Sequence, residues 1–199
     1  MRRRVLVGPA ASLFPVTATQ REEEVSMPQE QLRRLTETGL ALALVAVLNL
    51  IPPIFKMPQG GSVTAGSMVP IFFVALRWGG PWGIFSGILG GLINYWIDPQ
   101  YFHPVQWLLD YPVAFGMLGV AGFFRRVPAA GIIAGGALRF GAHVLSGVVF
   151  FASFAPEGLS PLLYAIIYNG SFMLPEVAIS VVVTLLLRRA MARPTPAMR

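Results

Sequence analysis

The sequence predicts an all-α membrane protein with several transmembrane helices. Of its 199 residues, 55% are hydrophobic, and the mean hydropathy is +0.64. Charged residues make up only 12% of the chain, against about 25% in a typical soluble domain. The basic residues stand between apolar runs, where membrane topology places them, and not together on one polar face. Topology therefore explains the net charge of +6 better than nucleic-acid binding does.

Six apolar segments are candidates for transmembrane helices, which need about 20 mostly apolar residues, or fewer where a helix is short or bent. The first ends at two prolines, the third is rich in glycine, and short polar or Pro/Gly-containing loops join them. In chain order, the six candidate segments are 36–51, 63–78, 81–97, 104–124, 129–154 and 161–187.

The placement of basic residues predicts that both termini are cytoplasmic. With Arg33 and Arg34 inside, nearly all the other arginines from there on fall at inner helix ends, and the outer loops hold only Lys56 among basic residues. Arg139 is the exception, because it falls inside the fifth segment, towards its cytoplasmic half.

The first 26 residues differ from the rest of the chain. They combine an arginine triplet, a weakly apolar run interrupted by prolines, and the polar stretch "QREEEVS". We interpret residues 1–26 as a disordered or misassigned extension, with a cleaved signal peptide as the alternative. Residues 27–199 then form a single six-helix membrane domain.

Several kinds of chemistry are excluded or disfavoured. The chain has no cysteine, and two histidines alone cannot form a metal site, so we expect no metal and no cofactor. It has no GxxxxGK[ST] motif, so any ATP-driven step must use another polypeptide. The serine of "HVLSG" is a poor nucleophile candidate, since no oxyanion hole is apparent. We therefore do not expect an enzyme.

Ionisable side chains inside a membrane span are candidates for functional sites, because lipid does not solvate them. Asp110 lies about two turns inside the outer end of the fourth segment. Helical spacing places it on one stripe with three other residues that could meet a flat cationic ligand, namely His103, Gln106 and Trp107. The alternative is a structural aspartate that bridges helices, for instance to Arg139.

The fifth and sixth segments carry further polar candidates. His143 follows Arg139 by one turn on the same face, and either residue could serve helix packing instead of a ligand. Asn169 and Glu176 share a face of the sixth segment. We expect Glu176, which follows a proline, to have a structural or coupling role.

Four stretches together resemble the thiamine-specific substrate-binding subunit of energy-coupling factor (ECF) transporters. They are "LIPP", "GSMVPIFFVALRWGGPWGIFSGILGGL", "HPVQWLLDYPVAFGMLGVAGFFRR" and "YAIIYNGSFMLPE". The resemblance covers residues 35–189 and is most specific at the acidic-Tyr pair and at Tyr-x4-Asn-Gly. It implies six membrane helices, an outward-facing pocket for thiamine, and location in a prokaryotic plasma membrane. It also implies as partners a transmembrane coupling protein and two ABC-type ATPases.

The resemblance implies roles for individual residues. Those implied or considered as substrate-binding are Asp110, Tyr111, His143, Tyr164, Asn169, Phe151, Trp107 and Gln106. The small pair Gly39 and Ala43 matches the helix that meets the coupling protein, although such pairs also serve internal packing.

This sequence departs from the family pattern at several positions. Family members can carry glutamate where Asp110 stands and a stacking tryptophan where Phe151 stands, and the first outer loop reads "MPQGGSV". Trp107, Tyr101 or Trp96 are possible substitutes for the missing aromatic cover. The alternatives to thiamine are another vitamin, the precursor hydroxymethylpyrimidine, or a small membrane enzyme or scaffold.

Overall fold

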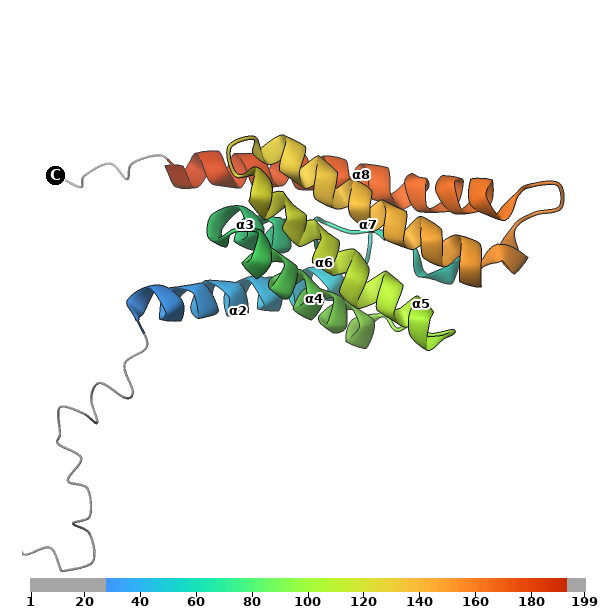
Figure 1. Ribbon diagram of the computed structural model, residues 1–199, viewed down its shortest axis with the longest axis horizontal. Helices are drawn as coiled ribbons and strands as arrows, with labels where there is room; N and C mark the ends of the chain where they lie inside the picture. The colour runs from blue at the N-terminus through green and yellow to red at the C-terminus, as the bar shows by residue number, and fades with distance from the viewer. Residues whose placement is uncertain (1–27, 193–199) are drawn as a thin grey trace, which may run out of the picture. The chain divides into compact units, whose positions relative to one another are not determined.

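The computed structural model describes residues 28–192, so the extension expected at residues 1–26 lies outside the described range. The described chain is helical apart from its loops and one small β-hairpin (Figure 1). In chain order, the elements are α2 (Gln29–Leu50), β1 (Phe55–Lys56), the 3₁₀ turn Pro58–Gly60, β2 (Ser62–Val63), α3 (Val69–Trp78), α4 (Gly80–Ile97), α5 (Pro104–Leu108), the π-helical turn Leu109–Val113, α6 (Ala114–Leu118), the 3₁₀ segment Gly119–Phe124, α7 (Pro128–Phe150), the 3₁₀ turn Ala152–Phe154 and α8 (Pro161–Ala192).

The chain divides into two compact units after Leu35. The described part of the first unit holds the start of α2, where the guanidinium of Arg34 donates to the carboxylate of Glu30 one turn earlier. The second unit begins at Thr36, and it contains all the structure described below.

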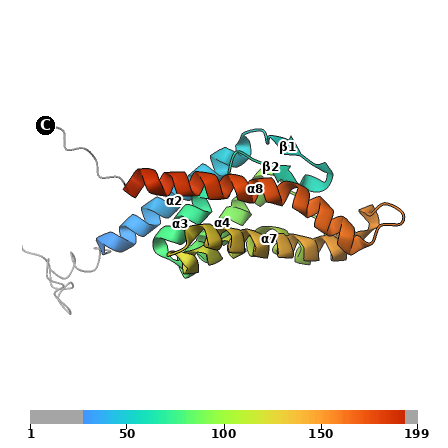
Figure 2. The same cartoon turned by 90° about the horizontal axis from the view of Figure 1, so that it is seen from above.

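The predicted helix 63–78 is wrong in its first part, because α3 begins only at Val69. Its 10 residues rise about 15 Å, half the thickness of a bilayer core. The preceding loop forms a hairpin in which Phe55 pairs with Val63, and β1 and β2 lie beside α8 (Figure 2). Gly60, at the tip, has a φ of 92°, which glycine adopts without strain. The Gly-Gly pair in "MPQGGSV" is the sequence signal for this turn.

The other helix ends differ from prediction by smaller amounts. α7 ends at Phe150, before the predicted residue 154, because Phe151 leaves the helical conformation with φ −117° and ψ 14° and a 3₁₀ turn follows. α8 continues to Ala192, beyond the predicted residue 187. Within residues 28–192, three helical stretches are long and apolar enough to cross a membrane: Pro104–Phe124, Pro128–Phe150 and Pro161–Met191.

Small residues on α4 allow the helical stretch Pro104–Phe124 to approach very closely. A Cβ atom at Gly87 would overlap the carbonyl oxygen of Phe115, and one at Gly91 would overlap that of Tyr111. On its other side, Pro104–Phe124 packs against α7, which also packs along α8. The segment that carries Asp110 is therefore held between two helices by backbone contact.

Candidate substrate-binding site

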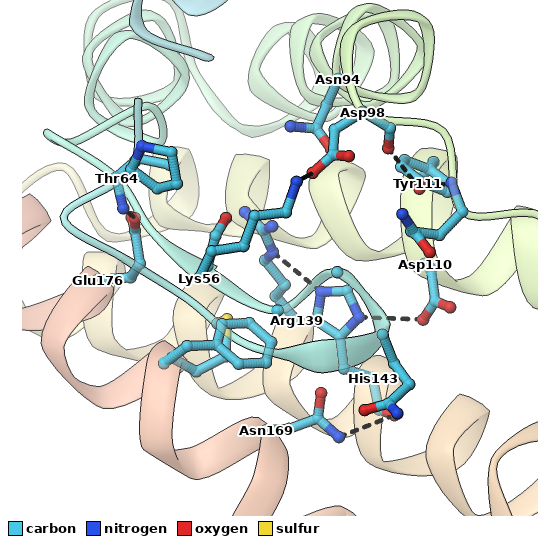
Figure 3. A pocket seen from close by; sticks show the side chains of 18 of the residues that line it. Lys56, Thr64, Asn94, Asp98, Asp110, Tyr111, Arg139, His143, Asn169 and Glu176 are labelled. Carbon is cyan, nitrogen blue, oxygen red and sulfur yellow. Dashed lines mark hydrogen bonds and ion pairs between the residues drawn. The ribbon is translucent and has the colours of Figure 1, made fainter. Parts of the chain in front are cut away.

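A cavity of about 390 Å³ lies among the C-terminal end of α2, the hairpin loop, the C-terminal end of α4, the Pro104–Phe124 stretch, α7 and α8 (Figure 3). Its volume falls in the range of about 300–1,000 Å³ that small-molecule sites occupy. It is lined by seven of the eight predicted substrate-binding residues: Asp110, Tyr111, His143, Tyr164, Asn169, Phe151 and Gln106.

The carboxylate of Asp110 accepts hydrogen bonds from three side chains. The Gln106 amide donates to Oδ2 over 2.7 Å, and the Ser146 hydroxyl donates to the same oxygen over 2.9 Å. His143 Nδ1 lies 3.0 Å from Oδ1. A carboxylate in a partly buried site is stabilised by donors of this kind. Ser146, three residues after His143, was not among the predicted site residues.

Arg139 reaches Asp110 only through His143. The guanidinium Nε donates to His143 Nε2 over 3.2 Å, so this ring nitrogen is an acceptor and Nδ1 carries the proton given to Asp110. The histidine is therefore the neutral tautomer in this chain of hydrogen bonds. A direct bridge from Asp110 to Arg139, the structural alternative at the sequence level, does not form. Arg139 also stacks on Phe115, 3.9 Å from the ring centroid.

Pro112 gives the site its local backbone geometry. Proline has no N–H to donate, and the N–H of Ala114 reaches back to the carbonyl of Leu109 in a five-residue, π-type bond. The resulting turn, Leu109–Val113, carries Asp110 and Tyr111. In the "DYP" motif, the proline therefore causes the helical irregularity on which the acidic residue lies.

Two predicted residues tie the helix to the loop before it. Gln106 is 1% exposed, donates to the carbonyl of Gln100 and accepts from the N–H of Phe102. The Tyr111 hydroxyl accepts from the N–H of Gln100 over 2.8 Å and donates to the carbonyl of Asp98 over 3.1 Å. Both side chains hold this loop in place as well as lining the cavity.

Aromatic side chains on α8 form one wall of the cavity. Tyr164, Tyr168 and Phe172 recur at four-residue spacing, with successive ring centroids 5.8 and 6.0 Å apart. Asn169 is buried between them and α7, and its amide donates to the carbonyl of Ala165 over 2.9 Å. Tyr168 and Phe172 were not predicted, although their spacing in "YAIIYNGSFM" is a detectable signal.

The hairpin loop, which the family resemblance had connected with the cover of the pocket, lines the cavity. Its Gly61 N–H donates to the Tyr168 hydroxyl over 3.1 Å, and that hydroxyl in turn donates to the carbonyl of Pro58. Lys56, on β1, forms an ion pair of 2.8 Å with Asp98. We call residues 51–68 the lid loop. Its sequence mixes apolar residues with prolines and glycines, so only its contacts identify it as a cover.

Glu176 lies on the cavity wall and holds the lid loop. Its Oε1 accepts from the backbone N–H of Thr64, while its Oε2 is buried without a hydrogen-bond partner among residues 28–192. The side chain is 4% exposed and follows Pro175 in α8. Figure 3 shows Glu176 and Asp110 on opposite sides of the view, with Arg139 and His143 between them.

Trp107 lies outside the lining of this cavity, and so does His103. The Trp107 indole packs edge-on against Tyr95, with ring centroids 5.8 Å apart. His103 caps α5 by accepting from the N–H of Val105, and its ring stacks on Phe150 at 5.1 Å. The expected stripe of four residues therefore does not face the cavity as one unit.

The remaining aromatic candidates also differ from expectation. Trp96 is 82% exposed and Tyr101 is 56% exposed, and neither lines the cavity. Phe151 does line it, with its ring 5.0 Å from that of Phe102. Of the aromatics considered as cover at the sequence level, Phe151 is thus the one that borders the cavity.

Gly39 and Ala43 lie on an exposed face of α2, away from the cavity lining. A Cβ atom at Gly39 would have no atom within 4 Å. Within the described second unit, this glycine is therefore not required for internal packing.

A family profile and two related proteins all point to the same family. The sequence profile described as "Thiamine transporter protein (Thia_YuaJ)" matches residues 35–195. The thiamine transporter ThiT of Bacillus subtilis (strain 168) is 39% identical over 176 residues, which is 79% of this chain and 91% of that protein. ThiT of Lacticaseibacillus paracasei is 29% identical over 178 residues, covering 77% of this chain and 86% of that protein.

A solved structure agrees with these relatives. ThiT from Listeria monocytogenes superposes with a TM-score of 0.72 at 26% identity, covering 81% of this chain and 97% of that chain. The family is one of transporters and not of enzymes, as the sequence motifs predicted. The apolar helices agree with a membrane location. The chain belongs to the thiamine transporter protein family.

Proposed function

We propose that this protein is the membrane substrate-binding subunit (S component) of an ECF transporter and that it takes up thiamine. Its relatives carry the name thiamine transporter, and its cavity has the chemistry that a cationic vitamin needs. The observation that carries the proposal is a lidded cavity whose lining contains three carboxylates and two basic side chains.

The charge of the cavity matches a monovalent cation. Lys56 and Asp98 form an ion pair at the rim, and Arg139 offsets one of the two remaining carboxylates, Asp110 and Glu176. With neutral His143 the lining carries a net charge of −1, which the permanent charge of a thiazolium ring neutralises. Burying a cation without such a partner costs on the order of several kcal/mol.

The aromatic wall supplies the faces for this ligand. Tyr164, Tyr168 and Phe172 on α8 and Phe151 after α7 border the cavity, where a thiazolium or pyrimidine ring stacks or makes cation–π contact. Asp110 provides the charge opposite the ring. The Asn169 amide and the Asp110–His143 pair provide hydrogen bonds, whereas Gln106 and Tyr111 position the loop and Asp110.

We further propose the setting in which this subunit works. Six helical segments lie in the plasma membrane of a prokaryote, the short α3 among them, with both termini in the cytoplasm, as the placement of basic residues indicates. The exposed face of α2 at Gly39 and Ala43 receives a transmembrane coupling protein, which associates with two ABC ATPases. The small side chains there permit close helix contact.

Titration of the purified protein, followed by its intrinsic tyrosine and tryptophan fluorescence, tests the substrate, because Tyr164 and Tyr168 border the cavity. We expect saturable quenching by thiamine at micromolar or lower concentration. Competition with free hydroxymethylpyrimidine and with other vitamins separates the alternatives, because a pyrimidine carrier would bind the neutral precursor at least as tightly. Quenching by another vitamin and none by thiamine would refute the proposal.

A further inference from the structure

The two carboxylates within the cavity differ in how much hydrogen-bonding capacity is already used. Asp110 accepts from Gln106, Ser146 and His143, whereas a carboxylate has about four acceptor positions in all. Glu176 accepts from the N–H of Thr64 at Oε1. Its Oε2 has no partner among the described residues. The unused acceptor capacity is therefore concentrated on Glu176.

The isolation of this oxygen is costly for the protein. Glu176 is 4% exposed, and a buried polar group without a partner destabilises the protein, more so when it is charged. The residue borders the cavity, so a ligand in the cavity can reach it. Binding of a donor group at Oε2 would therefore recover this energy.

The position of Glu176 defines which part of a ligand it can meet. It lies two helical turns, about 10 Å, beyond Asn169 along α8. Asp110 is on the other side of Arg139 and His143 (Figure 3). A ligand whose charge lies near Asp110 therefore turns a different group towards Glu176. Because Arg139 also borders the cavity there, an uncharged N–H or O–H donor fits this end better than a second cation.

We propose that Glu176 is a second substrate-contacting carboxylate, which accepts an N–H or O–H group of the ligand at Oε2 while Oε1 holds the lid loop at Thr64. The identity of the ligand rests on the function proposed above. In thiamine, the matching donors are the exocyclic amine of the pyrimidine and the hydroxyl of the hydroxyethyl arm. One carboxylate thus connects the ligand to the lid.

The test is Glu176→Gln, measured by titration with thiamine and with two analogues. One analogue has a carbonyl in place of the exocyclic amine, and the other lacks the hydroxyl group. Glutamine keeps an acceptor for the N–H of Thr64 but turns a donor towards the ligand. We expect thiamine to bind about 10- to 100-fold more weakly, and the analogue without the relevant donor to lose less than about 3-fold.

Tyr168→Phe is the matched control, because it removes the hydrogen bonds to Gly61 and Pro58 and leaves Glu176 intact. A defect in the lid alone weakens all three ligands by the same factor. If Glu176→Gln shows that uniform pattern, or no loss, the proposed contact is wrong and Glu176 only anchors the lid.

Two further outcomes are separable. If the wild-type protein binds no thiamine, the proposed function fails and this contact fails with it. If Glu176→Gln does not fold, a thiamine-bound structure of the wild-type protein decides. A ligand nitrogen or oxygen within about 3.2 Å of Oε2 supports the contact, and a longer separation overturns it.

Discussion

Replacing Asp110 by asparagine removes the carboxylate that we place opposite the thiazolium ring while keeping the shape of the side chain. In the structure, Asp110 accepts from Gln106, Ser146 and His143 at 2.7, 2.9 and 3.0 Å. An asparagine must turn its NH₂ group towards either the Gln106 amide or His143 Nδ1–H, so a donor faces a donor in either orientation.

The loss of charge sets the size of the effect on binding. A cation about 5 Å from the carboxylate interacts with it by about 3 kcal/mol at an effective dielectric constant of about 20. Losing this interaction raises the dissociation constant of thiamine by about 100- to 200-fold. Neutral hydroxymethylpyrimidine lacks the charge, so its affinity falls by less than about 5-fold, through the misplaced hydrogen bond.

Isothermal titration calorimetry with both ligands measures these changes. Ser146→Ala is the control, since it removes one donor to Asp110 and leaves the charge. We expect it to weaken both ligands equally, by less than about 10-fold. Equal losses of thiamine and hydroxymethylpyrimidine in Asp110→Asn would show that Asp110 organises the site and does not contact the cation.

Three other substitutions test the lid, the packing and the partner surface. Tyr168→Phe frees the lid loop and should raise the dissociation rate of thiamine about 5- to 20-fold in stopped-flow fluorescence, whereas Leu174→Ala, exposed on the same helix and outside the cavity lining, should not. Gly91→Ala pushes a methyl group against the Tyr111 carbonyl and should lower the melting temperature and weaken binding; Gly141→Ala, with open space around it, should do neither. Gly39→Leu should abolish co-purification with a coupling protein but keep thiamine binding; loss of binding would assign this glycine to internal packing.

The helices were predictable because their signals are local in the chain. Apolar runs bounded by prolines and glycines placed the starts of α4 and α8 within one residue. The error at 63–78 has a physical cause. Val63 was assigned to the start of the apolar run that becomes α3. Gly60 and Gly66 adopt positive φ angles that favour turns, and Val63 pairs with Phe55 instead.

The candidate site was predictable as a set of residues but not as an arrangement. Polar groups in apolar segments identified Asp110, His143 and Asn169, which do line one cavity. The helical stripe failed at Trp107, because a regular spacing of about 100° cannot tell which arc of a helix its neighbours cover. Packing against α4 and α7 decided that arc.

By itself, the sequence determined the class of protein, the helical segments and which side chains are too polar for lipid, because hydropathy and proline or glycine placement act within a few residues. The tertiary structure alone decided the partners. His143 meets Asp110 across 33 residues, Tyr168 meets Gly61 across 107, and Glu176 meets Thr64 across 112. Such contacts depend on how the helices pack and how the lid loop folds over them. The apolar run 103–115 therefore predicted a carboxylate at Asp110 in need of partners. Only the fold showed which donors hold it, and that Oε2 of Glu176 has no hydrogen-bond partner among residues 28–192.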